Sequence, residues 1–165
     1  MTLKEYNKAV KIISDRLYTF CLKNIGNEED AKDIVQHCYE QLWINKENIK
    51  YEKAKSYLYQ TAYNYIIDMI RKKKVRDRYM YQQPHKNFYE INENIDLAEN
   101  IDLALSQLSD IQRTVLLMRD LENYSYSEIG EITGLSAAQV KVYIYRARMR
   151  VKKIFEKLEG VKNDK

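Results

Sequence analysis

The chain has few of the residues that interrupt helices: its 165 residues include four glycines and one proline. All-β proteins need frequent turns, and glycine and proline are the residues that most often supply them. Hydrophobic residues nevertheless make up 45% of the chain, which is enough to bury a core. The composition therefore predicts a folded, all-α protein and disfavours a protein rich in strands.

Residues that hold metals or do covalent chemistry are also scarce. The two cysteines, Cys21 and Cys38, and the two histidines, His37 and His85, are too few and too far apart for a disulfide framework or a zinc cluster. The sequence also lacks a glycine-rich phosphate loop, a nucleophile elbow and paired carboxylates on a shared apolar face. We therefore expect no enzymatic activity, no metal or other cofactor, and no small-molecule substrate.

Long hydrophobic runs are missing as well. No apolar segment approaches the ~20 residues that span a bilayer, and the first residues do not combine a basic patch, an apolar run and a cleavage site. These observations predict a cytoplasmic protein that does not insert into membranes.

The excess of positive charge is small, +4 in total, but it is concentrated in two stretches. The first, Arg71–Arg78, has six basic residues and a single acid, Asp77. The second, Lys141–Lys153, has six basic residues and no acid. Local concentration of charge matters more than the total, and basic segments are typical of proteins that bind nucleic acids.

The stretch Ser125–Lys153 has the pattern of a helix-turn-helix. Ser125 with Glu128 forms a capping box for a short helix, and Gly134 supplies the left-handed residue that ends it. A second capping box then opens a longer basic helix at Ser136. A short helix, a tight turn and a basic helix fit the major groove of DNA, although a solvated basic face on a packing helix remains the alternative.

The first part of the chain predicts two packing helices. Apolar residues step at helical spacing from Leu3 to Leu22, Gly26 breaks the pattern, and Asn27 is placed to cap the next helix. The apolar stripe of that second helix consists of Ala31, Ile34, Val35, Cys38 and Leu42. Its polar outer face consists of Asp33, Gln36, His37 and Glu40. A polar outer face is expected of any surface helix, so it names no partner by itself.

A third helix is predicted after Ser56, and it runs directly into the basic stretch Arg71–Arg78. The residues expected on its outer face are Tyr59, Tyr63, Asn64, Ile67, Asp68 and Arg71. Aromatic rings interleaved with amides and cations suit a single-stranded nucleic acid, since bases stack on rings and phosphates follow cations. Each tyrosine taken singly is equally well explained by packing, because the chain has 15 of them.

The periodicity fails between residues 79 and 100, where Pro84 and a series of acids predict a flexible linker. A new helix is expected near residues 95–108, and Ser109 with Gln112 forms a third capping box. The sequence therefore predicts two small helical domains, residues 1–78 and 101–165, joined by the acidic linker 79–100.

Three motifs occur in a fixed order along the chain. The first is Asp-Ala-Lys-Asp-Ile-Val-Gln at 30–36, followed by Leu42 and Trp43, and the second is residues 55–74 with the spacing Asn64, Asp68 and Arg71. The third comprises residues 105–113, 126–132 and 140–148. In this order the motifs resemble those of small, two-domain bacterial RNA polymerase sigma factors, the extracytoplasmic-function (ECF) class of the sigma-70 family. The resemblance covers nearly the whole chain.

The resemblance implies an alternative sigma factor that binds core RNA polymerase and directs initiation at particular promoters. It implies polymerase contacts by Asp33 and Gln36, with Asp30 and Glu40 beside them. It implies contacts with the opened minus-ten strand by Asn64, Asp68, Arg71 and Lys72, with Tyr57, Tyr59 and Tyr63 as stacking surfaces. It implies contacts with the duplex minus-thirty-five element by Ser136, Ala137, Ala138, Gln139, Lys141, Val142, Tyr143, Arg146 and Arg148. An anti-sigma factor is the regulator that the resemblance implies.

The chain departs from the family pattern on the reading surface. Ala138 and Gln139 stand where the family often has Gly-Thr, and Val142 and Tyr143 stand where it often has Ser-Arg. Glutamine can pair with adenine through two hydrogen bonds, and valine can meet a thymine methyl group. We therefore predict a shifted promoter preference. A further departure, Ser109 in place of a proline, keeps a residue that can cap a helix.

The main alternative is a helix-turn-helix regulator that binds duplex DNA without polymerase. It accounts for residues 125–153 but leaves the polar face with Asp33 and Gln36 unexplained, as it does the spacing of Asn64, Asp68 and Arg71. A module whose helices bind only protein is a further alternative.

Overall fold

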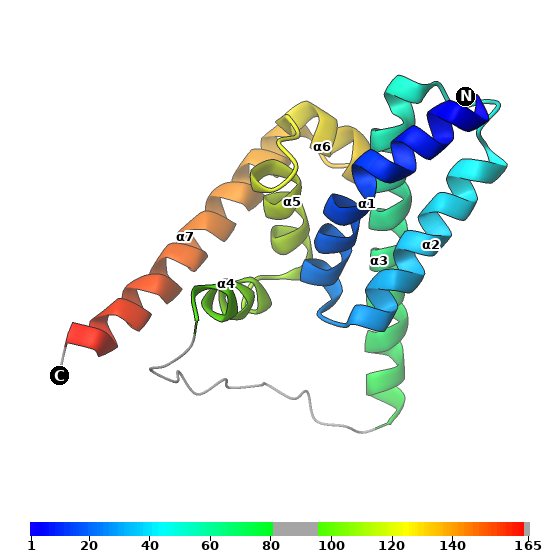
Figure 1. Cartoon of the computed structure of the whole chain (residues 1–165). Helices are drawn as coiled ribbons and strands as arrows, with labels where there is room; N and C mark the ends of the chain where they lie inside the picture. Colours follow the sequence, from blue (N-terminus) through cyan, green and yellow to red (C-terminus); the bar gives the residue numbers. More distant parts are fainter. Residues whose placement is uncertain (81–95, 164–165) are drawn as a thin grey trace. The chain divides into compact units, whose positions relative to one another are not determined.

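The computed structural model describes residues 1–80 and 96–163, and in these ranges it contains α-helices, one short 3-10 helix and no strand (Figure 1). The prediction of an all-α protein is confirmed. The helices form two compact units. The first contains α1, α2, η1, α3 and Glu131–Gly134 at the end of α6, and the second contains α4, α5, α6 up to Gly130, and α7. Residues 81–95, which include Pro84 and most of the predicted linker, lie outside the described residues.

The first unit is a bundle in which each of three long helices packs on the other two. Its elements are α1 (Leu3–Ile25), α2 (Glu28–Ile44), η1 (Tyr51–Lys53) and α3 (Ala54–Tyr79). Apolar residues at three- and four-residue steps give each helix one buried face. The largest fully buried side chains between them are Leu17, Phe20, Ile34, Leu42, Leu58, Tyr59 and Ile66.

Local capping signals fix where α1 ends and α2 begins. Gly26 adopts a left-handed conformation (φ 73°), and its N–H donates to the carbonyl of Leu22. The Asn27 side chain then accepts a hydrogen bond from the backbone N–H of Asp30 at 3.0 Å. Both signals were predicted, and α1 extends three residues beyond the predicted end at Leu22 because it continues to its glycine cap. A capping box between Thr2 and Glu5 at the start of α1 was not predicted.

Two residues expected on outer faces are partly or fully buried. Tyr59 is fully buried, with its ring centroid 5.1 Å from that of Phe20, so the prediction that it faces outward is wrong. His37 is half-buried, and its ring lies 4.7 Å from that of Tyr65. The reason is that α2 and α3 each pack on the other two long helices, which makes their buried faces wider than one apolar stripe.

The second unit is organised on the long helix α7, which packs against α4 and α5. Its elements are α4 (Leu97–Ser106), α5 (Asp110–Asp120), the part of α6 (Tyr126–Thr133) up to Gly130, and α7 (Ala137–Asn163). Val115, Met118, Ile129, Val140, Ile144 and Ala147 are fully or almost fully buried.

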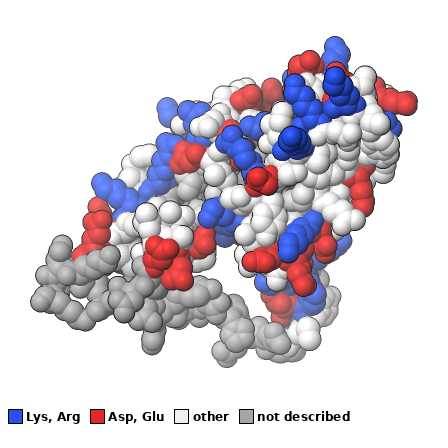
Figure 2. Space-filling model, viewed as in Figure 1, with Lys and Arg blue, Asp and Glu red and all other residues white. Residues whose placement is uncertain are grey.

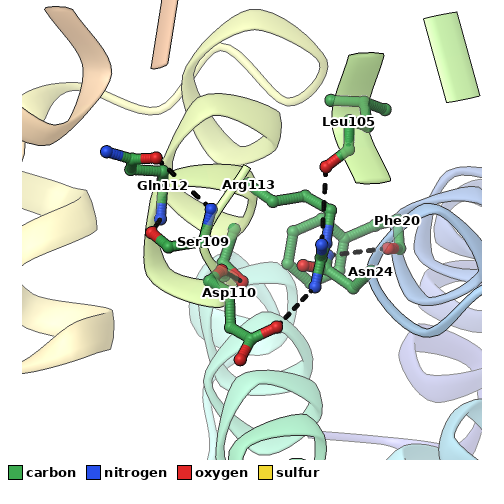
Figure 3. Close-up of polar contacts among 8 residues, drawn as sticks. Phe20, Asn24, Leu105, Ser109, Asp110, Gln112 and Arg113 are labelled. Carbon is green, nitrogen blue, oxygen red and sulfur yellow. Dashed lines mark hydrogen bonds and ion pairs between the residues drawn. The ribbon is translucent and has the colours of Figure 1, made fainter. Parts of the chain in front are cut away.

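The α4–α5 junction is held by side chains that bond to nearby backbone (Figure 3). Ser109 and Gln112 form the predicted capping box, so serine does cap this helix. The Arg113 guanidinium donates to Asp110 at 2.7 Å and to the carbonyl of Leu105 at 3.4 Å. These contacts fix the angle at which the chain enters α5.

The turn between α6 and α7 is tight. The predicted capping boxes at Ser125 and Ser136 are both present, and Gly134 has the left-handed conformation (φ 77°) expected at the end of α6. A side chain at Gly130 would place its Cβ 2.6 Å from the carbonyl oxygen of Leu135. This turn therefore needs a glycine one turn before the end of α6 as well as one at its end.

Candidate nucleic-acid and polymerase interfaces

The first turn of α7 presents a continuous exposed surface. Ser136, Ala137, Ala138, Gln139, Lys141 and Val142 are exposed, and Tyr143 is half-buried. Val140 and Ile144 point into the unit and are buried. The helix therefore offers a row of small and polar side chains at its N-terminal end, which is the end that reads bases when a recognition helix enters the major groove.

Gln139 already has a structural role in this surface. Its side-chain oxygen accepts a hydrogen bond from the N–H of Ser136 at 2.9 Å, and the Ser136 hydroxyl accepts one from the N–H of Gln139 at 3.1 Å. Pairing with adenine through both amide atoms needs the same oxygen. Base reading and helix capping would therefore share the Gln139 oxygen, which has two lone pairs and accepts one bond from Ser136.

Three of the cations along α7 are predicted DNA contacts, and they differ in their surroundings. Figure 2 shows basic side chains along the visible side of this helix. Lys141 and Arg146 are exposed. Arg148 instead donates two hydrogen bonds to the carboxylate of Asp120, at 2.5 and 3.3 Å. Hydrogen bonding to Asp120 raises the pKa of Arg148 above its usual value.

On α3 the residues of the second motif share one face. Asn64 and Arg71 are exposed, and Asp68 lies between them, four residues from one and three from the other. Asp68 forms an ion pair with Lys72 at 2.8 Å, and the hydrogen bond from Lys72 lowers the pKa of the Asp68 carboxyl. From Arg71 to the end of α3 every side chain is exposed. The helix thus presents an amide, an ion pair and then a run of cations.

The three tyrosines predicted as stacking surfaces have different environments. The Tyr57 hydroxyl accepts a hydrogen bond from Asn45 at 3.0 Å, which ties the start of α3 to the end of α2. Tyr63 is half-buried, and this burial raises its pKa. Tyr59 is buried and offers no ring face to a base. Tyr57 and Tyr63 therefore remain candidates, and Tyr59 does not.

The outer face of α2 carries the predicted polymerase contacts. Asp33, Gln36 and Glu40 are exposed, and Asp30 is half-buried in the first turn of the helix. The Gln36 amide donates to the Glu40 carboxylate at 3.1 Å. This arrangement is an acidic and polar strip along one side of the helix.

Two features of these surfaces were missed from the sequence. The strip on α2 continues into Trp43 and Ile44, whose side chains are 41% and 69% exposed, so it ends in an apolar patch. The spacing of four residues between Glu40 and Ile44 already indicated that Ile44 lies on the same face of the helix. The partner of Arg148, Asp120, lies 28 residues away in the sequence, and no local spacing indicates such a pair.

Within the described part of the chain, no group of three or more His, Cys, Asp or Glu side chains is arranged to hold a metal ion. No helix within residues 1–80 or 96–163 is long and apolar enough to cross a membrane.

Comparison with known proteins assigns each half of the chain to a family model. Residues 10–76 match the sigma-70 region 2 family, and residues 98–151 match the sigma-70 region 4 family. The chain is 30% identical to the ECF RNA polymerase sigma factor SigW of Bacillus subtilis, over 87% of this chain and 85% of SigW. It is 26% identical to the ECF sigma factor SigM of the same organism, over 86% of this chain and 89% of SigM.

Solved structures share the fold. The sigma factor RpoE of Bartonella quintana, solved in complex with the anti-sigma factor NepR, superposes with a TM-score of 0.77 at 21% identity, covering 93% of this chain and 98% of RpoE. CnrH, solved in complex with the cytosolic domain of CnrY, superposes with a TM-score of 0.66 at 19% identity, covering 92% of this chain and 87% of CnrH.

A region 2 match followed by a region 4 match defines a two-domain protein of the sigma-70 type. The chain belongs to the ECF RNA polymerase sigma factors, which are alternative sigma factors that bind core RNA polymerase and direct initiation at particular promoters. The resemblance noted in the sequence is confirmed.

Proposed function

We propose that the functions of this sigma factor lie in two separate domains, residues 1–78 and residues 101–165. The first binds core polymerase through α2 and opens the minus-ten element with α3, and the second reads the minus-thirty-five element as a duplex. The observation that carries the proposal is the outer face of α2. There, Asp33, Gln36 and Glu40 are exposed on one side of the helix, within and just after the motif that resembles the family's polymerase-binding helix.

Opening of the promoter would use the exposed face of α3. Asn64 offers amide hydrogen bonds to a base, Arg71 and Lys72 offer cations to phosphates, and Asp68 orients Lys72 through their ion pair. Tyr57 and Tyr63 supply partly exposed rings. A flipped base that is stacked and hydrogen-bonded recovers the few kcal/mol that unstacking costs, so binding of the strand favours opening.

Reading of the duplex would use the N-terminal turn of α7. Ser136, Ala137, Ala138 and Gln139 form the end of the helix that would approach the base edges, together with Val142. Lys141, Tyr143 and Arg146 would contact phosphates.

We further propose that the protein acts in the cytoplasm and is not an enzyme, because a sigma factor works on polymerase and DNA without catalysing a reaction itself. An anti-sigma factor is its proposed regulator, because RpoE, which shares its fold, was solved in complex with the anti-sigma factor NepR. CnrH, which also shares the fold, was solved in complex with the cytosolic domain of CnrY. A stand-alone regulator is not favoured, because it gives no role to the region 2 match.

The test is run-off transcription from a pool of promoter fragments, using core polymerase with and without the chain and sequencing the transcript starts. We expect new starts that share two spaced elements, and we expect Asp33→Ala with Gln36→Ala to abolish them. The matched control is Lys11→Ala with Asp15→Ala, two exposed residues of α1, which should keep the starts. New starts that survive the loss of Asp33 and Gln36 would refute the polymerase contact. Sequence-specific duplex binding with no new starts would favour the stand-alone regulator.

A further inference from the structure

Arg148 is exposed and lies beside the buried stripe of α7. It follows the buried Ile144 by one helical turn and is adjacent to the buried Ala147. Its Nη2 and Nε atoms lie 2.5 and 3.3 Å from the two carboxylate oxygens of Asp120. Both side chains are about half exposed, at 49% and 47%, so the pair sits at the edge of the α5–α7 contact. Arg146, two residues earlier, is exposed and makes no ion pair with a described residue.

Asp120 is an unusual choice for its position. It is the last residue of α5, where the free carbonyl groups of the helix create a negative potential that disfavours an acid. A cation from another helix offsets this potential, and the two-pronged contact of arginine with a carboxylate also fixes the relative orientation of the two groups. The pair therefore joins the end of α5 to the middle of α7 with a defined geometry.

The start of α6 is held by Arg119, the residue before Asp120. The Arg119 guanidinium lies 5.1 Å from the centroid of the Tyr126 ring and donates to the carbonyl of Tyr124 at 2.9 Å. Tyr126, the first residue of α6, also contributes, after Asp120, to raising the pKa of Arg148. Side chains from α5, α6 and α7 thus meet at one corner of the unit.

We propose that the Asp120–Arg148 pair sets the angle at which α7 enters the major groove, so that Arg148 is a positioning residue for duplex reading and not a phosphate contact. This inference rests on the proposed reading of the minus-thirty-five element by α7. It revises the DNA contact that the resemblance implied for Arg148. Side chains that read base edges must be held to within about half an ångström, and the surrounding contacts supply that precision.

The two roles of Arg148 predict opposite effects of Asp120→Asn. If Arg148 binds a phosphate, removing the neighbouring acid frees the arginine and removes a repulsive charge, so DNA binding tightens. If Arg148 positions α7, the variant makes the orientation of the helix less well defined. Binding of the preferred duplex then weakens by about fivefold, which corresponds to the loss of one partly exposed ion pair.

The experiment uses the full chain with core polymerase and a duplex that the wild-type complex enriches from random sequence. Binding is measured for Asp120→Asn and Arg148→Lys, over a range of salt concentrations. Lysine can hold a phosphate as a point charge but cannot reproduce the two-pronged contact with Asp120. We expect both variants to weaken binding of the enriched duplex by similar factors, to bind unrelated duplex like the wild type, and to keep the wild-type salt dependence.

Arg146→Ala is the matched control, because it removes an exposed arginine from the same helix. It should weaken binding to all duplexes and reduce the slope of log K against log salt by about 0.9. Tighter binding by Asp120→Asn, or wild-type binding by Arg148→Lys, would overturn the positioning role.

Failure of the proposed function would look different. In that case the wild-type complex enriches no duplex, and the variants of Asp120 and Arg148 enrich none either. Thermal unfolding of Asp120→Asn, Arg148→Lys and the double variant then measures the pair directly. If the double variant is no less stable than either single variant, the two side chains stabilise the unit through their contact with each other. If the losses of stability in the two single variants add up in the double variant, the inference is overturned.

Discussion

At the scale of single residues, Gln139 combines two uses that share one oxygen atom. The amide oxygen accepts one hydrogen bond from the N–H of Ser136, while adenine recognition needs a second bond to that oxygen and one from the amide nitrogen. A glutamate keeps an acceptor for the cap and places a negative charge at a helix N-terminus, where it is favourable. It lacks the donor that adenine requires.

We therefore predict that Gln139→Glu leaves the free energy of unfolding within about 0.5 kcal/mol of the wild type. It should also abolish a preference for adenine at one position of the minus-thirty-five element. Selection from random DNA with core polymerase measures the preference, and Gln112→Glu, the same change in the box of α5, is the control. An unchanged preference in Gln139→Glu, or in Gln139→Thr, would show that this side chain does not read the base.

The two thiols give a second prediction at this scale. Burial raises the pKa of Cys38 to about 12, and it raises the pKa of Cys21 further. In the unfolded chain both thiols ionise near pH ~8.5. The folded state holds them protonated, so their contribution to stability is complete below that pH and is lost as the pH rises toward the folded pKa values. Stability should fall by about 1 kcal/mol per thiol between roughly pH 7.5 and 9.5.

Urea unfolding at the two pH values measures this loss. Tyrosines and lysines also begin to ionise in that range, so the comparison is with Cys21→Ala combined with Cys38→Ala. The double variant is less stable at both pH values, because it removes buried volume, but its stability should depend less on pH. An equal pH dependence would show that the thiols do not contribute.

At the scale of elements, the close approach of α6 to the following turn leaves no room for a side chain at Gly130. An alanine there would put its Cβ 2.6 Å from the backbone oxygen of Leu135, and a backbone atom cannot move aside as a flexible side chain can. Gly160, inside α7, has nothing within 4 Å of the same position. The two glycines thus separate the steric effect from helix propensity.

We predict that Gly130→Ala destabilises the chain by about 1–3 kcal/mol, because overpacking outweighs the gain in helix propensity. Gly160→Ala should instead stabilise the chain by up to about 1 kcal/mol. Chemical denaturation of both variants measures the two free energies. If Gly130→Ala proves as stable as the wild type, then the turn tolerates a wider separation of α6 and α7 than its geometry indicates.

The elements also show what a sequence can and cannot predict. The capping boxes at Ser109, Ser125 and Ser136 were predicted correctly because each depends on residues three apart in the same segment. The burial of Tyr59 was not, since helical periodicity marks one stripe and gives no information that α3 lies against two helices at once. The pairing of Asp120 with Arg148 depends on how α5 packs on α7, and only the folded unit reveals it.

At the scale of the whole molecule, the small net charge of +4 hides a strong segregation of charge. The end of α3 from Arg71 onward carries exposed cations with a single acid among them, whereas α1 carries cations and acids together on its exposed side. Because DNA binding releases counterions from the phosphates that the protein neutralises, the salt dependence of binding reports the cations that touch DNA and not the net charge.

We therefore predict that Lys73→Gln with Arg76→Gln reduces the slope of log K against log salt for an opened promoter strand by about 1.4, at about 0.7 for each lost contact with single-stranded DNA. The matched variant is Lys4→Gln with Lys11→Gln, which removes the same two charges from exposed positions of α1 and should leave the slope unchanged. Titration of the chain with core polymerase against a bubble-containing promoter from about 50 to 200 mM salt measures both. Equal slopes for the two variants would mean that α3 does not follow the DNA backbone beyond Lys72. In that case Lys73 and Arg76 do not contact the strand, and Arg71 and Lys72 are the cations of α3 that we expect to hold it.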